Sequence, residues 1–203
     1  MLMGGWLISK KPRERRMRGE AVRVKDASSL SRVLRSVSEE QGANAAVAVL
    51  LKREKEELSV LFVKRVESPA DPWSGQMAFP GGKRSEQDLS LKQTVLRETL
   101  EETGINLLDR CRFLGVLKAL RSGPRYDLRV LPFVVFVEYE PRVRLNREEL
   151  KDFYWIPFEE LVQSETSVRF DFGEFPAYSV RNEVIWGLTY RVLEDFFAVL
   201  KLA

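Results

Sequence analysis

The feature that most constrains the fold is a pair of apolar runs separated by four charged residues. The runs are "NAAVAVLLKR" (44–53) and "LSVLFVKR" (58–65), and the connection is "EKEE". Short runs of this composition are typical of buried strands, and the short connection predicts an antiparallel pair. Because helical segments follow that can cover both faces of such a sheet, we expect an α/β/α sandwich.

The rest of the chain alternates between helical and strand-like patterns. Apolar residues recur at helical spacing in "EVIWGLTYRVLEDFFAVL" (183–200), which predicts a helix packed into the core, with a homodimer contact as the alternative. The glycines and prolines of 71–83 predict a loop. The other expected elements are a helix at 89–103, strands at 111–120, 128–139, 153–156 and 168–172, and a helical turn at 158–162.

Two regions are expected within the 203 residues. Residues 1–41 form a basic N-terminal extension with a short helix at 27–41, packed by Leu30, Val33 and Leu34. Residues 42–203 are long enough for one domain with its own core. The net charge of +3, from 33 basic and 30 acidic residues, is small for a nucleic-acid-binding protein. Oligonucleotide binding rests only on the charge run "KKPRERRMR" (10–18), and with no membrane-length apolar run we expect a cytoplasmic protein.

Residue counts limit the chemistry. The chain contains no histidine and one cysteine, Cys111. This excludes an intrachain disulfide, a Cys/His zinc site and a nucleophile activated by histidine. Catalysis would have to use carboxylates, lysines, arginines, hydroxyls, backbone groups or a bound metal.

Negative charge is concentrated at the end of the helix expected at 89–103. "RETLEETG" places Glu98, Glu101 and Glu102 within about a third of the helix circumference, just before Gly104. Like charges at this spacing and anions near a helix C-terminus together cost about 1 to 2 kcal/mol. A bound cation would account for the arrangement. Oxygen ligands favour Mg²⁺ or Mn²⁺, and Mg²⁺ in turn favours a substrate with phosphate groups.

The segment from Gly82 to Ile105 resembles the Nudix box. Its second half matches that pattern at every fixed position, and such a match should arise by chance in about one of a million windows. In its first half, Asp88 replaces the usual glutamate, and eight residues, not seven, lie between it and the arginine. The matching residues of the second half are Arg97, Glu98, Glu101, Glu102 and Gly104.

The spacing of the residues in and around this segment also resembles the subgroup that includes coenzyme A pyrophosphatases. "FPGGK" (79–83), Asp88 and Thr94 fit that subgroup, and the likeness continues weakly to the C-terminus. Upstream, Arg65 matches its first arginine, but Asp71 stands where a second arginine is expected. This weakens the indication of coenzyme A as the substrate.

The resemblance implies a mixed β-sheet and hydrolysis of a nucleoside diphosphate linked to another group. It also implies catalytic roles for Arg97, Glu98 and Glu102, with Arg97 orienting a glutamate by an ion pair. The metal would be Mg²⁺, with Mn²⁺ as a substitute. Its ligands would be the Gly82 carbonyl, Glu98, Glu101 and Glu102.

Other assignments stay open from the sequence. The glycines at 81 and 82 allow close approach of the backbone to a metal or a phosphate. Trp73 and Tyr178 are candidates for base stacking, and Phe79 for packing beneath the glycine turn. Further candidate bases are Glu138, Glu140, Glu148, Glu149 and Glu165, and candidate substrate contacts are Arg65, Gly81, Arg121 and Arg125.

The leading hypothesis is an Mg²⁺-dependent hydrolase acting on coenzyme A. Hydrolysis of ADP-ribose or of another nucleoside diphosphate or triphosphate is the first alternative. A nucleotide-binding module without turnover is the second.

Overall fold

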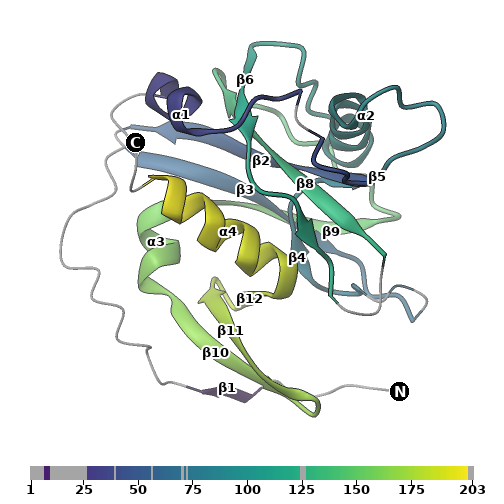
Figure 1. The fold of residues 1–203 in the computed structure, drawn as a ribbon. Helices are drawn as coiled ribbons and strands as arrows, with labels where there is room; N and C mark the ends of the chain where they lie inside the picture. The colour runs from purple at the N-terminus through teal and green to yellow at the C-terminus, as the bar shows by residue number, and fades with distance from the viewer. Residues whose placement is uncertain are drawn as a thin grey trace.

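The structure is a computed structural model that describes residues 7–9, 27–38, 40–55, 57–69, 71, 73–123 and 127–200. In this part of the chain, helices cover both faces of an eight-stranded mixed sheet, as Figure 1 shows, so the predicted α/β/α sandwich is confirmed. None of the described helices has the length and apolar character of a membrane span. The basic run at 10–18 lies outside the described residues.

The predicted strand pair forms the centre of this sheet. Strand β2 (Ala45–Glu54) pairs antiparallel with β3 (Glu57–Arg65) near their connection, from Leu51 opposite Val60 to Glu54 opposite Glu57. β2 also pairs in parallel with β8 (Arg129–Val137), which makes the sheet mixed. β6 (Cys111–Val116) and β7 (Leu120–Arg121) pair with β8, and β9 (Leu150–Pro157) pairs with β3.

The segment expected to be a plain loop, 71–83, contributes two short strands. β4 (Met77–Ala78) pairs with β3, and β5 (Gly81–Lys83) pairs with the first residues of β2. The pairing of β2 with β3 covers only the connection end of both strands, so the opposite ends are free to pair with this segment. The loop prediction was therefore wrong for these residues.

Two hydrophobic clusters lie on opposite faces of the sheet. One packs α2 (Leu91–Thr103) through Leu91 and Val95 against strand residues such as Leu61 and Phe133. The other packs α1 (Ala27–Val33), α3 (Phe158–Gln163) and α4 (Gly187–Leu200) against the second face.

The predictions for the two terminal helices need correction. The first helix ends at Val33 rather than Gln41, and although Leu30 is buried and Leu34 packs against the core, Val33 is exposed. At the C-terminus, Gly187 begins α4, and Ile185 belongs to a strand. Phe196 and Leu200 of α4 are buried, which confirms the core-packing interpretation, so a homodimer contact is not needed to cover this face.

A second sheet was not predicted from the sequence. Its four described strands are ordered β1 (Leu7–Ser9), β10 (Glu165–Phe170), β11 (Gly173–Val180) and β12 (Glu183–Trp186), all antiparallel. β1 belongs to the N-terminal extension, so part of that extension pairs with the C-terminal half of the chain (Figure 1).

Candidate active site

Helix α2 carries the acidic residues, and its ends are fixed by capping groups. At its start, the Ser90 hydroxyl accepts a hydrogen bond from the Gln93 N–H. At its end, Gly104 adopts a left-handed conformation with φ of 71°, and its N–H donates to the Leu100 carbonyl at 2.9 Å. This ending places Glu98, Glu101 and Glu102 in the last two turns, as the sequence predicted.

The glycine turn of β5 lies directly against two of these glutamates. The Gly81 N–H donates to Glu102 Oε2 at 2.8 Å. A Cβ atom on Gly82 would lie only 2.5 Å from the carboxyl carbon of Glu98, so the Glu98 carboxyl group fills the space where a side chain would begin. On the other side, a Cβ on Gly81 would lie 2.2 Å from the Ala46 carbonyl oxygen of β2. At Gly81 only glycine fits, because a side chain would meet the backbone of β2, whereas at Gly82 a side chain would displace the Glu98 carboxyl group.

Arg97 serves two of the three glutamates as a counter-ion. Its Nη1 donates to Glu98 Oε1 at 2.8 Å and to Glu101 Oε2 at 3.0 Å. Arg97 therefore supplies part of the positive charge that the sequence argument assigned to a bound cation. Among the described side chains, no cation pairs with Glu102, which is only 3% exposed.

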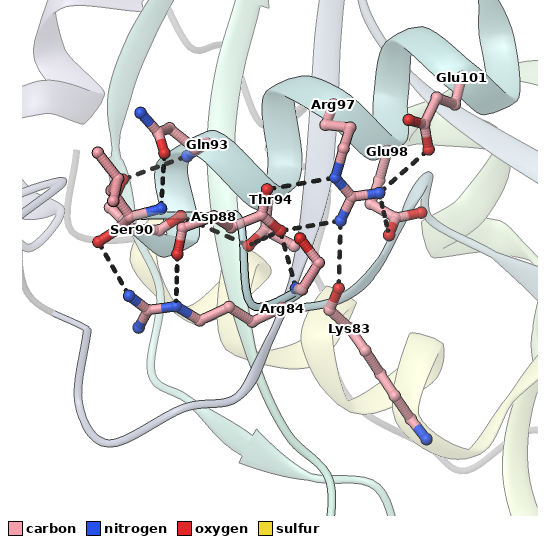
Figure 2. A network of polar contacts seen from close by, with 11 residues as sticks. Lys83, Arg84, Asp88, Ser90, Gln93, Thr94, Arg97, Glu98 and Glu101 are labelled. Carbon is pink, nitrogen blue, oxygen red and sulfur yellow. Dashed lines mark hydrogen bonds and ion pairs between the residues drawn. The ribbon is translucent and has the colours of Figure 1, made fainter.

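Asp88 holds Arg97 from the opposite side, as Figure 2 shows. Arg97 Nη2 donates to Asp88 Oδ2 at 2.9 Å and Nε donates to Oδ1 at 3.2 Å. The Ser85 N–H and the Thr94 hydroxyl also donate to Oδ2, at 2.9 and 3.0 Å. Asp88 therefore anchors the arginine that binds Glu98, a role that the sequence left open.

The loop that carries Asp88 is itself held in place by Arg84 and Glu40. Arg84 donates to the carbonyl oxygens of Asp88 and Leu89 at 3.0 and 2.9 Å (Figure 2). Glu40 accepts from Arg84 Nη1 at 3.1 Å and from the Leu91 N–H at 2.7 Å. Neither residue was among the candidates, and the role of Glu40 depends on contacts 44 and 51 residues away in sequence.

Burial raises the pKa of the two glutamates beside the glycine turn. For Glu102 it raises the pKa to about 8, opposed by the Gly81 N–H and the charge of Arg65 and assisted by the charges of Glu98 and Glu149. Burial also raises the pKa of Glu98, although the ion pair with Arg97 works against it. In contrast, Arg97 holds the pKa of Asp88 well below its usual range.

The residues around the glycine turn fit a hard divalent cation. No three acidic, cysteine or histidine side chains within the described ranges form a preformed metal cluster. However, Glu102 is buried beside a second carboxylate and pairs with no cation in the described part of the chain, and Gly82 leaves room for the Glu98 carboxyl group. Carboxylate oxygens in such a position suit Mg²⁺ or Mn²⁺.

A segment before β9 brings a further carboxylate to the same site. The N–H groups of Arg144 and Asn146 donate to the carbonyls of Thr103 and Glu102, at 2.7 and 2.9 Å, and so fix this segment on the end of α2. The Asn146 side chain then donates to Glu149 Oε1 at 3.0 Å. The charge of Glu149 raises the pKa of both Glu98 and Glu102, so it lies within electrostatic reach of them.

The other candidate bases have different neighbours. Glu138 pairs with Arg112 at 2.6 Å, and Glu140 with Lys52 at 2.8 Å. Glu165 accepts from the Tyr190 hydroxyl at 3.2 Å. Glu148 is exposed. None of these four contributes to the pKa shifts of Glu98 and Glu102.

The residues predicted to contact the substrate lie in different parts of the structure. Arg65 lies near enough to Glu102 to lower its pKa, and Gly81 is part of the glycine turn. Arg121 is exposed on β7, which is separated from β5 by β2 and β8. Arg125 lies outside the described residues.

The aromatic candidates also have distinct surroundings. Tyr178 is 2% exposed and its hydroxyl donates to Glu194 Oε1 at 2.6 Å, so the stacking prediction is wrong for this residue. Phe79 is buried and stacks on Phe62, with 5.1 Å between ring centroids, and thus packs beneath the glycine turn as expected. For Trp73, which is partly exposed, base stacking stays a prediction.

Comparison with known proteins places this arrangement in context. The family model described as NUDIX domain matches residues 42–177. A structure described as a MutT/nudix family protein from Enterococcus faecalis aligns with a TM-score of 0.52 and 21% identity, over 80% of this chain and 64% of that chain. At this identity the likeness concerns the fold alone.

Two relatives have names that state an activity. The human mitochondrial coenzyme A diphosphatase NUDT8 is 30% identical over 173 residues, which are 79% of this chain and 70% of that protein. The peroxisomal coenzyme A diphosphatase ndx-8 of Caenorhabditis elegans is 30% identical over 135 residues, which are 65% of this chain. Among the curated relatives, the chain spans 35% to 56% of the length of three, the C. elegans protein included.

Proposed function

The chain belongs to the Nudix family, and on that premise we propose that it is an Mg²⁺-dependent pyrophosphohydrolase. Its substrate class is a nucleoside diphosphate linked to a second group, with coenzyme A as the leading candidate. The observation that carries the proposal is the position of Glu102, a buried carboxyl beside Glu98 and the glycine turn that forms no ion pair with any described side chain. The names of the two coenzyme A diphosphatase relatives support the substrate.

In this proposal, Glu98, Glu101, Glu102 and the Gly82 carbonyl hold the metal. When bound, Mg²⁺ neutralises charge that develops on the leaving phosphate and lowers the pKa of an attacking water. Arg97 keeps the Glu98 carboxylate facing the glycine turn, because one of its nitrogens donates to Glu98 while the others are bound to Asp88. The Gly81 N–H holds Glu102 in the same way.

Glu149 is our candidate for the general base. The absence of histidine leaves a carboxylate as the natural proton acceptor. Of the five candidate bases outside α2, Glu149 is the one whose charge reaches Glu98 and Glu102. It is exposed, so it can exchange the proton with solvent after each turnover.

Product analysis tests this function. The purified protein is incubated with Mg²⁺ and, separately, coenzyme A, ADP-ribose, NADH, dinucleoside polyphosphates and nucleoside triphosphates. We expect 3′,5′-ADP and phosphopantetheine from coenzyme A, and none in the presence of a chelator. Cleavage only of another substrate would retain the hydrolase and discard coenzyme A. Metal-independent binding without cleavage would favour the nucleotide-binding module.

Two further expectations stay proposals. We place the protein in the cytoplasm, although the two named relatives are called mitochondrial and peroxisomal. We also retain a division at residue 41, with residues 1–41 as an extension that contributes β1 and α1.

A further inference from the structure

The loop between β3 and β4 is closed at its base by its own hydrogen bonds. The Gly75 N–H donates to the Val66 carbonyl at 3.2 Å, and the Ser68 N–H donates to the Ser74 hydroxyl at 2.8 Å. These bonds hold the two arms of the loop together. The loop lies directly before the strand that leads into the glycine turn, so its position relative to the acidic site is fixed by β3 and β4.

Asp71 is the polar centre of this loop. Its Oδ1 accepts from the Trp73 N–H at 2.9 Å, and its carbonyl accepts from the Ser74 N–H at 3.0 Å. Its Oδ2 accepts from Arg65 Nε at 2.8 Å, with only 17% of the Asp71 side chain exposed. Because both carboxylate oxygens are bound, the carboxylate holds the guanidinium in one place.

Among the described residues, the Arg65 guanidinium forms a hydrogen bond through Nε only. Nε is bound to Asp71, but within the described part of the chain neither terminal nitrogen has a hydrogen-bond partner. The side chain is 27% exposed, and its charge lowers the pKa of Glu102. Two terminal nitrogens carry four N–H groups, and a guanidinium presents them in a geometry that suits phosphate oxygens.

We propose that Asp71 is a positioning residue: it fixes Arg65 through Nε so that the terminal nitrogens bind a phosphate oxygen of the substrate beside Glu102. The inference rests on the proposed function, because it assumes a diphosphate substrate at this site. It assigns a use to Asp71, which stands where the subgroup pattern leads us to expect a second arginine. The loop then offers the substrate one cation held in a fixed position.

A double-mutant cycle with Arg65→Ala and Asp71→Asn tests the proposal. We expect Asp71→Asn to raise KM about threefold to tenfold with kcat within about twofold, because it loosens Arg65 without removing it. Arg65→Ala should raise KM further, and adding Asp71→Asn to it should then have no further effect. If Asp71→Asn raises KM by the same factor in both backgrounds, its role is only structural and the proposal is wrong. Thermal unfolding of all variants shows whether the loop remains folded.

Two further variants sharpen the result. Arg65→Lys keeps the charge but loses the planar arrangement of donors, so its KM should lie between the wild-type value and that of Arg65→Ala. Arg142→Ala removes an exposed arginine outside this loop and should leave KM unchanged. An equal rise in KM for Arg142→Ala would indicate a general charge effect and overturn the proposal.

Equilibrium binding separates this inference from the hydrolase proposal. Coenzyme A and ADP-ribose are titrated calorimetrically into the full chain in the presence of a chelator. We expect affinity to decrease from the wild type to Asp71→Asn and further to Arg65→Ala. If the three proteins follow this order but the wild type shows no turnover, the hydrolase proposal fails while the role of Asp71 stands. If neither compound binds the wild type, the role of Asp71 is refuted.

Discussion

Asp88 and Glu102 are both almost completely buried, with 7% and 3% exposure, yet their environments act on them in opposite directions. Asp88 accepts hydrogen bonds from Arg97, Ser85 and Thr94, and its pKa lies well below the usual range. Glu102 accepts one hydrogen bond from Gly81, and its pKa is raised to about 8. Burial alone therefore does not decide the charge state; the number and charge of the partners do.

This difference separates a residue that supports the site from one that is held ready for a ligand. A carboxylate with several donors and an arginine is already satisfied, and it fixes the arginine in return. A buried carboxyl that lacks a cation gains most from binding one. The comparison predicts that changes at Glu102 affect catalysis most and that changes at Asp88 affect both stability and catalysis.

The largest expected effect is that of Glu102→Gln on activity. Removal of a metal-binding carboxylate should lower kcat/KM about 10²-fold to 10³-fold, because it removes several kcal/mol of charge stabilisation. The amide oxygen can still accept the Gly81 N–H, so the variant should remain folded. Steady-state kinetics beside thermal unfolding measure both effects. Glu148→Gln, at an exposed glutamate, is the matched control, and full activity of Glu102→Gln would remove Glu102 from the metal site.

The second expected effect is that the free energy of unfolding depends on pH when a chelator removes divalent metal ions. Because the pKa of Glu102 is raised from 4.5 to about 8 in the folded protein, the folded state binds more protons than the unfolded state between these values. Stability should therefore fall as pH rises from about 5 to 8, by an amount on the order of a few kcal/mol. Mg²⁺ should stabilise the protein more at pH 8 than at pH 6.

Urea unfolding at several pH values measures this trend. Glu102→Gln, which cannot ionise, should show a flatter profile in chelator. A wild-type profile that is equally flat would mean that Glu102 is solvated or paired in solution. Asp88 does not interfere in this range, because its lowered pKa contributes stability that is lost only as pH falls below 3.8, its ordinary value.

The contrast between these two carboxyls also shows what the sequence could predict. The pattern of Glu98, Glu101 and Glu102 predicted one acidic helix face, because helix periodicity fixes which side chains share a face. The central strand pair and α2 were predictable for the same reason, since their patterns are local. The positions of the candidate ligands thus followed from spacing.

The partners of those residues could not be read from the sequence. Arg97 binds Asp88, which lies nine residues earlier and before the start of α2, and Glu40 reaches Leu91 from 51 residues away. Of the second sheet, only the strand expected at 168–172, which overlaps β10, was anticipated. β12 is four residues long and lies in the segment with helical spacing, and β1 is far from its partner β10 in sequence. Contacts of this kind depend on the whole fold rather than on a local period.

Asp88→Asn should have the next largest effect. Loss of the charge weakens the bond to Arg97, which then holds Glu98 less firmly, so kcat/KM should fall about 10-fold to 100-fold, as for other residues that orient metal ligands. Stability should fall by about 1 to 3 kcal/mol, because the donors of Ser85, Thr94 and Arg97 lose a charged acceptor. Urea unfolding and kinetics measure the two losses together. An unchanged kcat/KM with lowered stability would reduce Asp88 to a purely structural residue.

The smallest effect on kcat/KM is expected for Gly82→Ala, which tests the role of Glu98. Glu98 is paired with Arg97, and yet its pKa is raised. In Gly82→Ala the new methyl group would meet the Glu98 carboxyl group, the mobile end of a side chain, so Glu98 can move aside with little cost in stability. Metal binding should weaken, with kcat/KM at fixed Mn²⁺ about tenfold lower and recovering at higher Mn²⁺.

Gly81→Ala is the contrast, because its methyl group would meet the Ala46 carbonyl of β2 and its φ of 145° disfavours a side chain. That variant should lose stability instead, and a Gly82→Ala protein with unchanged metal dependence would show that Glu98 does not contact the ion.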